Sequence, residues 1–369
     1  MALIERTSRP WIAGSIAAAL LSYAPLAHAE PATAEPAAVM LPAGEARKVA
    51  PLLEAAAFGQ ANRIADLLAA KADVDVVDQD GNSPLGLAAL GGHVALARLL
   101  IEAGASIDHA NARGETPLAQ AAAGGHTALV RMLGAKGAEL DRPTAAGHAP
   151  LALAAMRCHD GAVAALIKAG AEAHRVATSQ TRQTALMLSA MHCDDKTLVA
   201  ILADANARAD LLAARDGQGR TALGHAAEGG NTRALAALLA HGAEVNASDA
   251  GGETPLHRAV AHRAAMDLLL AHGAAAGTPS RDGTTPLMRA AAIGNVAAIE
   301  ALLANGAAIN VRSRSGQTAL MVAAGAGRVD AVRRLLAAGA DRSLRNVRRE
   351  TARDIAATGG HADVLTSLR

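Results

Sequence analysis

The chain has 369 residues, of which 51% are hydrophobic and 1% aromatic, and its 35 basic and 34 acidic side chains give a net charge of +1. Proteins that bind nucleic acids concentrate Lys and Arg on one face and often stack bases on aromatic rings. The near-neutral, aromatic-poor composition therefore argues against a nucleic-acid partner.

The N-terminus has the three parts of a secretory signal peptide. Arg6 and Arg9 form a short basic region, an apolar run extends from Trp11 to Ala24, and Ala27-His28-Ala29 offers a small-residue cleavage site. The run is shorter than the roughly 20 apolar residues that span a bilayer. We therefore expect residues 1–29 to be cleaved, the mature protein to be periplasmic, and no stable membrane insertion to follow cleavage.

A stretch rich in alanine and proline follows the expected signal peptide. Residues 30–46 contain Pro31, Pro36 and Pro42 and few large apolar side chains. Such a composition favours an extended or disordered leader. The folded part of the protein is therefore expected to begin near residue 47.

From residue 47 to residue 369 the chain repeats itself with a period of about 33 residues. The start of a predicted helix recurs at ten positions: Ala50, Ser83, Thr116, Ala149, Thr184, Thr221, Thr254, Thr285, Thr318 and Thr351. In one clear unit, Thr116 is able to cap free N–H groups while Pro117 occupies the first helical position, where its missing donor costs nothing. Gly125 is expected to end this helix, and a second helix with an apolar face at Leu129, Val130 and Leu133 follows.

Two short helices and a turn in each unit, with Gly252-Glu253-Thr254-Pro255-Leu256-His257 as the best example, make the chain resemble the ankyrin-repeat family. The resemblance covers residues 47–369. It implies an all-α repeat solenoid of about ten stacked units with β-hairpin loops and altered capping repeats at both ends. It also implies that His257 makes hydrogen bonds between repeats.

The resemblance further implies a non-catalytic protein–protein interaction module. Such proteins hold a protein or peptide in a concave groove made from hairpin tips and the exposed face of each first helix. The matching hairpin positions are Arg113, Glu115, His148, Gln183, Arg220, Arg281 and Arg314, and the matching first-helix positions are Met156, Arg157, Met191, His192, Glu228 and His262. For each of these the competing interpretation is an ordinary solvated side chain. Motifs of metalloproteases, serine hydrolases and P-loop enzymes do not occur, and we expect neither a cofactor nor an enzymatic activity.

The two cysteines, Cys158 and Cys193, stand in neighbouring units at the position where Gly125 ends its helix. Packed helices lie about 8–10 Å apart, farther than the 4.4–6.8 Å between the Cα atoms of a disulfide. An exported protein with an even cysteine count nevertheless favours a bond. Unpaired thiols and a metal site that includes His159 and His192 remain open. The last would make the protein a periplasmic metal-binding or thiol-redox factor, which is the alternative function.

Departures from the period cluster in the middle of the array. Two extra residues follow Gly170 and four follow Ala205, which predicts hairpins that project farther than their neighbours. The unit at Thr254 is two residues short, which places Arg263 at the glycine position. We expect an irregular solenoid between about residues 156 and 275, and a specific function is most plausible there.

A cluster of arginines near the C-terminus has two interpretations, a solvated cap or an anion-binding patch. Its members are Arg342, Arg345, Arg348, Arg349 and Arg353.

Overall fold

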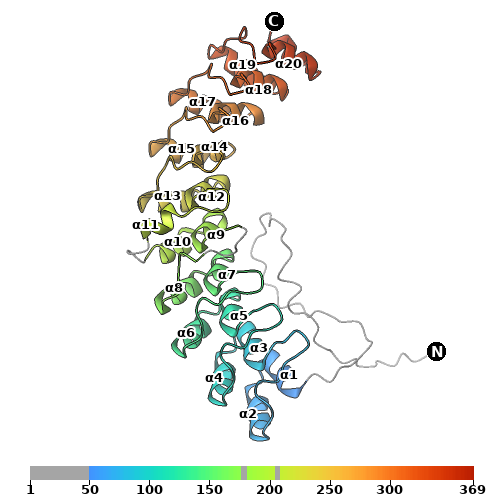
Figure 1. Cartoon of the computed structure of the whole chain (residues 1–369), viewed down its shortest axis with the longest axis vertical. Helices are drawn as coiled ribbons and strands as arrows, with labels where there is room; N and C mark the ends of the chain where they lie inside the picture. The colour runs from blue at the N-terminus through green and yellow to red at the C-terminus, as the bar shows by residue number, and fades with distance from the viewer. Residues whose placement is uncertain (1–49, 176–180, 204–207) are drawn as a thin grey trace, which may run out of the picture.

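The computed structural model describes residues 50–175, 181–203 and 208–369, so the predicted signal peptide and leader lie outside the described residues. The described chain forms an elongated, curved stack of helix pairs (Figure 1). No β-strand occurs in these ranges, and none of their helices is long and apolar enough to cross a membrane. The predicted all-α repeat solenoid is confirmed.

Each unit contributes a first and a second helix to the stack. The first helices are α1 (Pro51–Ala57), α3 (Pro84–Leu90), α5 (Pro117–Ala123), α7 (Pro150–Met156), α9 (Ala185–His192), α12 (Ala222–Glu228), α14 (Pro255–Ala259), α16 (Pro286–Ile293), α18 (Ala319–Gly325) and α20 (Ala352–Thr358). The second helices are α2 (Ala61–Ala69), α4 (Val94–Glu102), α6 (Thr127–Ala135), α8 (Asp160–Ala169), α10 (Asp195–Ile201), α13 (Thr232–Ala240), α15 (Arg263–Ala271), α17 (Val296–Ala304), α19 (Val329–Ala337) and α21 (Ala362–Ser367). One further helix, α11 (Arg208–Ala213), has no counterpart in the other units.

The local sequence explains where the first helices begin and end. The residue at each of the ten predicted start positions directly precedes a first helix. In the third unit the Thr116 hydroxyl accepts a hydrogen bond from the backbone N–H of Ala119 at 3.2 Å, and Pro117 is the first helical residue. After the helix Gly125 adopts φ 71°, in the left-handed region that favours glycine.

Small residues allow the first helices to pack closely, and leucines fill the space between the two layers. Ala121 and Ala122 of α5 are fully buried, as are Leu129 and Leu133 of α6. Equivalent residues of every unit join one continuous hydrophobic core along the stack. Because each unit covers the apolar face of the next, stability depends on stacking of neighbours. Figure 1 shows the first helices on the inner side of the arc and the second helices on the outer side.

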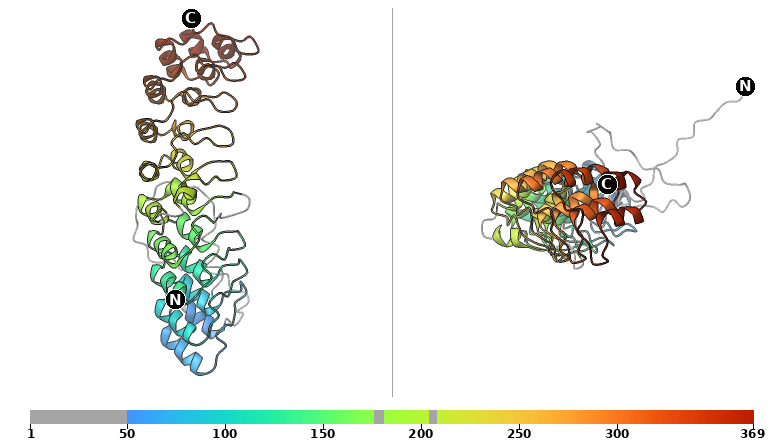
Figure 2. Two further views of the ribbon diagram at one scale, coloured as in Figure 1. Left: turned by 60° about the vertical axis from the view of Figure 1, so that its left-hand side comes forward. Right: turned by 90° about the horizontal axis from the view of Figure 1, so that it is seen from above.

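The hairpin loops that precede the first helices are linked by a row of backbone hydrogen bonds. The N–H of Ala112 donates to the carbonyl of Asp80, and the N–H of Ala145 donates to that of Arg113, both at 2.8 Å. The same bond recurs near the other end, where Arg314 donates to Asp282 at 2.8 Å. Wherever this bond occurs in the described residues, it holds one loop in register with the next, and the loops project to the same side of the stack (Figure 2).

In seven units, a second row of contacts joins the residue before the second helix to the end of the first helix of the preceding unit. Nε2 of His126 lies 2.9 Å from the carbonyl oxygen of Leu90, and Nε2 of His159 lies 3.1 Å from that of Ala123. Asn295 and His361 make the same link, to Val260 at 2.8 Å and to Gly325 at 3.0 Å. We call this row the helix-start ladder.

The register predicted around Arg263 is wrong. Helix α14 has only five residues, Ala261 stands at the glycine position, and Arg263 is the first residue of α15, directly after His262. Nε2 of His262 lies 3.1 Å from the carbonyl oxygen of Glu228, so this histidine belongs to the helix-start ladder. The two residues are therefore missing from the end of the first helix, and the contact of the helix-start ladder is kept.

The second predicted projecting hairpin is also wrong. Residues 204–207 lie outside the described residues, and the chain from Arg208 onward forms α11, in which Leu211 is fully buried and Leu212 nearly so. Figure 1 places α11 on the outer side of the arc, at the level of α10 and α13. The insertion therefore adds to the core on the outer side instead of lengthening the hairpin. Of the insertion after Gly170, residues 176–180 lie outside the described residues.

Candidate binding surface

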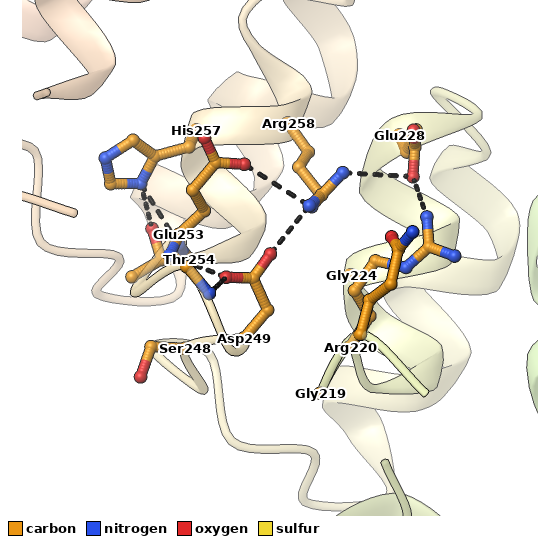
Figure 3. Close-up of polar contacts among 12 residues, drawn as sticks. Gly219, Arg220, Gly224, Glu228, Ser248, Asp249, Glu253, Thr254, His257 and Arg258 are labelled. Carbon is orange, nitrogen blue, oxygen red and sulfur yellow. Dashed lines mark hydrogen bonds and ion pairs between the residues drawn. The ribbon is translucent and has the colours of Figure 1, made fainter. Parts of the chain in front are cut away.

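The inner side of the arc carries a network of charged side chains across three consecutive units. Arg258 of α14 lies at its centre and contacts Asp249 at 2.6 Å, Glu253 at 3.2 Å and Glu228 at 3.3 Å. Figure 3 shows the Arg258 guanidinium between the two carboxylates of its own unit and Glu228 of the preceding unit. At the far end Glu253 also pairs with Arg289 of the next unit. We call this set, together with Arg220 and Asp216, the inner charge network.

The inner charge network reaches the core of the sixth unit through Arg220. Its guanidinium contacts Glu228 at 3.0 Å and Asp216 at 2.8 Å. Burial by itself raises the pKa of Asp216, but hydrogen bonds from the backbone amides of Arg220 and Gln218 and from the Arg220 side chain outweigh it and hold the pKa below 3.8. Asp216 is therefore a carboxylate at neutral pH, held inside the hairpin turn.

Two buried histidines of the first helices are neutral at neutral pH. Burial, with a contribution from Arg220, lowers the pKa of His225, whose Nε2 lies 3.0 Å from Asp216. Burial also lowers the pKa of His257. Nδ1 of His257 accepts from the backbone N–H of Thr254 at 3.1 Å, so Nε2 carries the proton and donates to the carbonyl of Thr284, also at 3.1 Å. The link expected of His257 between repeats is thereby confirmed.

A shallow groove of about 400 Å³ lies next to the inner charge network, between the eighth and ninth units. Arg289 and Met288 of α16 form part of its wall, and Arg314 and Gln317 of the following hairpin form another part. The remaining lining side chains are small or polar, apart from Val322 of α18: Asp282, Thr284, Ala292, Ser313 and Ser315. The groove is open to solvent and combines hydrogen-bond donors with the half-buried apolar side chains of Ala292 and Val322.

Cys158 and Cys193 form a disulfide bond between the fourth and fifth units, with their Cα atoms 5.2 Å apart. Cys158 adopts φ 58°, the left-handed conformation that glycine has at the same place in α5. Cys193 is extended instead, with φ −85°, and it is buried. The interpretation as two unpaired thiols is wrong, and because each sulfur is bonded to the other, neither is a thiolate ligand while the bond is intact.

Comparison with protein families identifies the repeat. A model of three consecutive ankyrin repeats matches residues 52–144, 186–278, 244–313, 262–346 and 287–369. The chain belongs to the ankyrin-repeat family. Comparison with curated proteins gives no match. Ankyrin repeats generally act as protein–protein interaction modules, and they use the extended concave surface that their stacking creates.

The predicted contact residues of this ankyrin array are spread along the inner side, and the structure brings only some of them together. Arg113 pairs with Glu115 at 2.9 Å, and Arg220 pairs with Glu228. The exposed members are His192, Glu228, His262, Arg281 and Arg314. The half-buried members are Arg113, Glu115, His148, Met156, Arg157, Gln183, Met191 and Arg220. Because of its place directly before α15, His262 is not a first-helix residue as predicted. The use of these residues by a partner stays a prediction.

Sequence reasoning missed Arg258 and Arg289, which link the units of the ankyrin array. Both occupy the fifth position counted from the threonine that starts the unit, Thr254 or Thr285. Most other units carry an aliphatic side chain there, as Leu153 does. An arginine at a position that is aliphatic in five of the other eight units was the available signal, but the sequence did not show which carboxylates it contacts.

Among the residues that the structure describes, no group of three or more His, Cys, Asp or Glu side chains is arranged to hold a metal ion. Of the four side chains predicted for a metal site, Cys158 and Cys193 form the disulfide bond, and the two histidines are their neighbours in the chain. His159 joins the helix-start ladder, and His192 is exposed at the end of α9.

Proposed function

We propose that the inner face of this ankyrin array, formed by the hairpin row and the first helices, binds another protein along several units. The observation that supports this most directly is the row of loops fixed in register by backbone hydrogen bonds, with exposed side chains at the tips. A rigid row of this kind limits the ordering cost of binding. A shallow groove suits an extended segment or a folded surface better than a small molecule, which usually requires a deep apolar pocket.

Three substitutions, two on the inner side and one on the outer side, test which face binds the partner. Ile293 ends the first helix α16 and Val199 lies on the second helix α10, and each side chain is 46% exposed. We expect Ile293→Glu and His192→Glu to abolish capture of the partner from periplasmic extract, and Val199→Glu to leave capture unchanged. Loss of capture with Val199→Glu alone would assign binding to the outer face and overturn the proposal.

We also propose that the protein is exported to the periplasm. The signal-peptide pattern of residues 1–29 supports export, and a disulfide bond is typical of proteins that fold in oxidising compartments. Trp11 is the only tryptophan of the chain. The mature protein should therefore lack tryptophan fluorescence, and emission from protein purified out of the periplasm would show that the segment is retained.

A further inference from the structure

The last three hairpins differ from the rest of the row in charge. The first complete hairpin carries Asp78 and Asp80, whereas the hairpins of the eighth to tenth units carry arginines: Arg281, Arg312, Arg314, Arg345, Arg348 and Arg349. These arginines outnumber the acidic residues of the same loops, Asp282 and Glu350. The C-terminal part of the row is therefore positively charged in an otherwise near-neutral protein.

Two of these arginines, Arg281 and Arg314, stand at equivalent places in consecutive loops, and among the described residues their side chains make no contact that stabilises the fold. The backbone N–H of Arg281 donates to Gly251 and that of Arg314 donates to Asp282, both at 2.8 Å, which fixes the two residues in the same register. Both side chains are exposed, and no ion pair or side-chain hydrogen bond holds either one in the described part of the chain. Arg220 and Arg258, by contrast, are committed to the inner charge network.

Asp282, which follows Arg281 in the same loop, forms no ion pair with Arg281 or Arg314 in the described part of the chain. Both oxygens of Asp282 are used inside its own loop, by the Ser280 hydroxyl at 2.5 Å and by the backbone and hydroxyl of Thr284 at 2.9 Å. These hydrogen bonds hold the pKa of Asp282 below 3.8. The Asp282 carboxylate therefore stabilises its own turn, and the guanidinium groups of Arg281 and Arg314 stay exposed.

The terminal arginines are partly engaged. Arg345 donates to the carbonyl of Arg349 at 2.6 Å, Arg348 pairs with Glu350 at 3.0 Å, and Arg342 donates to the carbonyl of Arg369. These contacts agree with a solvated cap. The anion-binding interpretation is better supported in the two preceding hairpins, at Arg281 and Arg314, where the groove of about 400 Å³ adjoins the tips.

We propose that Arg281, Arg314 and the adjoining groove bind an extended acidic segment of the protein partner. Carboxylates of the segment would form charge-assisted hydrogen bonds with the two guanidinium groups, and small apolar side chains between them would contact the half-buried Ala292 and Val322. A nucleic acid is the less suitable polyanion, since residues 281–369 contain no aromatic side chain on which a base could stack. This inference rests on the function proposed above.

The test is fluorescence anisotropy with the full mature chain and defined probes. The first probe is a labelled peptide of about 12 residues that alternates Glu and Ala, which spans roughly 40 Å when extended. The second probe replaces every Glu with Gln, and the third is an oligodeoxythymidylate of similar charge. We expect the Glu peptide to bind about tenfold or more tighter than the other two, with an affinity that falls as salt is added.

Two charge-reversal variants separate a site from a net-charge effect. Arg281→Glu with Arg314→Glu should weaken binding of the Glu peptide by about tenfold or more. The matched control reverses two exposed arginines of the outer layer, Arg98 of α4 and Arg131 of α6, and should change the affinity by less than about twofold because screened charges far from the site contribute little. Circular dichroism melts of both variants establish that each is folded.

Three outcomes would overturn the inference: equal binding of the Glu and Gln peptides, tighter binding of the oligonucleotide, or equal weakening by the two double variants. If one of these occurs while Ile293→Glu still blocks capture of the protein partner, the inference fails and the proposed function stands. If capture is insensitive to every inner-face variant, the proposed function fails as well.

Discussion

Arg258 contacts three carboxylates of the inner charge network, and among the described residues it is the one ion-pair partner of Asp249. Its side chain is 16% exposed, as is that of Glu253, and the side chain of Asp249 is 6% exposed. Removing one partner of such a buried set leaves charges without compensation, which costs more than the pairing itself contributes. Loss of Arg258 should therefore lower the free energy of unfolding much more than loss of a surface arginine of the same unit.

Arg258→Met should therefore lower the free energy of unfolding by about 2–3 kcal/mol. The control is Arg263→Met in the same unit, whose 2.7 Å pair with Asp267 is about half exposed. That change should cost less than about 0.5 kcal/mol. Urea unfolding followed by circular dichroism measures both, and equal losses would show that the inner charge network has no special weight.

Neutral histidines make the stability depend on pH. Burial lowers the pKa of His257, of His225, of His148 and of His159 below 6.5, so at mildly acidic pH the unfolded chain binds protons that the folded chain does not. Their contribution is complete above the unfolded pKa of 6.5 and is lost as pH falls from 6.5 towards the folded values. Burial raises the pKa of Asp141 from 3.8, which acts in the opposite direction at lower pH.

We predict that the urea midpoint falls between pH 7 and pH 5, and that His257→Gln, although less stable at pH 7, shows a smaller fall. The reason is that the variant has one protonation difference fewer between its folded and unfolded states. Parallel pH profiles of the variant and the parent protein would contradict this assignment.

Single residues show where the sequence was informative and where it was not. The threonine before each helix and the glycine after it act on their own backbone, so Thr116 and Gly125 could be assigned from neighbouring letters. The contacts of Arg258 join residues up to 30 positions apart, from Glu228 onward. The register shows that they share a face, but the choice of partner depends on side-chain conformations that the sequence pattern does not specify.

The turn between α9 and α10 shows how one element compensates for another. At the place where most other units have a histidine, asparagine or arginine that joins the helix-start ladder, this unit has Asp194, which caps its own helix at Thr197. A carboxylate cannot donate to the carbonyl of the preceding unit. The bond between Cys158 and Cys193 joins the two units at this point instead.

Replacing both cysteines with serine should lower the free energy of unfolding by about 3–4 kcal/mol, because the bond closes a loop of 35 residues in the unfolded chain. Chemical unfolding with and without reductant measures the effect. Reductant should destabilise the parent protein by a similar amount and leave the double variant unchanged. A double variant as stable as the oxidised parent protein would show that the bond is dispensable.

Helices were predicted well where the period was regular and poorly where it was not. The insertion that forms α11 contains a short apolar run, which by itself is compatible with a loop, a strand or a helix. Burial of Leu211 on the outer layer decides between them, and that surface exists only after the units have stacked. The register of the shortened α14 was predicted wrongly for a related reason. The sequence shows that two residues are missing from the unit, but only a contact such as that of His262 shows where they are missing.

The whole molecule follows from repetition. Each unit leaves an apolar face that only a neighbour covers, so ten similar units give an elongated arc with a continuous core and one inner face (Figure 1). The period therefore predicted the fold class and the row of loops. It could not predict the charge that each loop contributes to the surface, because surface residues vary independently of the stacking.

The most direct test of binding by the inner face is amide hydrogen exchange of the mature protein, alone and with its captured partner. We predict slower exchange in the hairpin loops and at the ends of the first helices, with the second helices unchanged. Slower exchange confined to the second helices, from α2 to α21, would contradict the account.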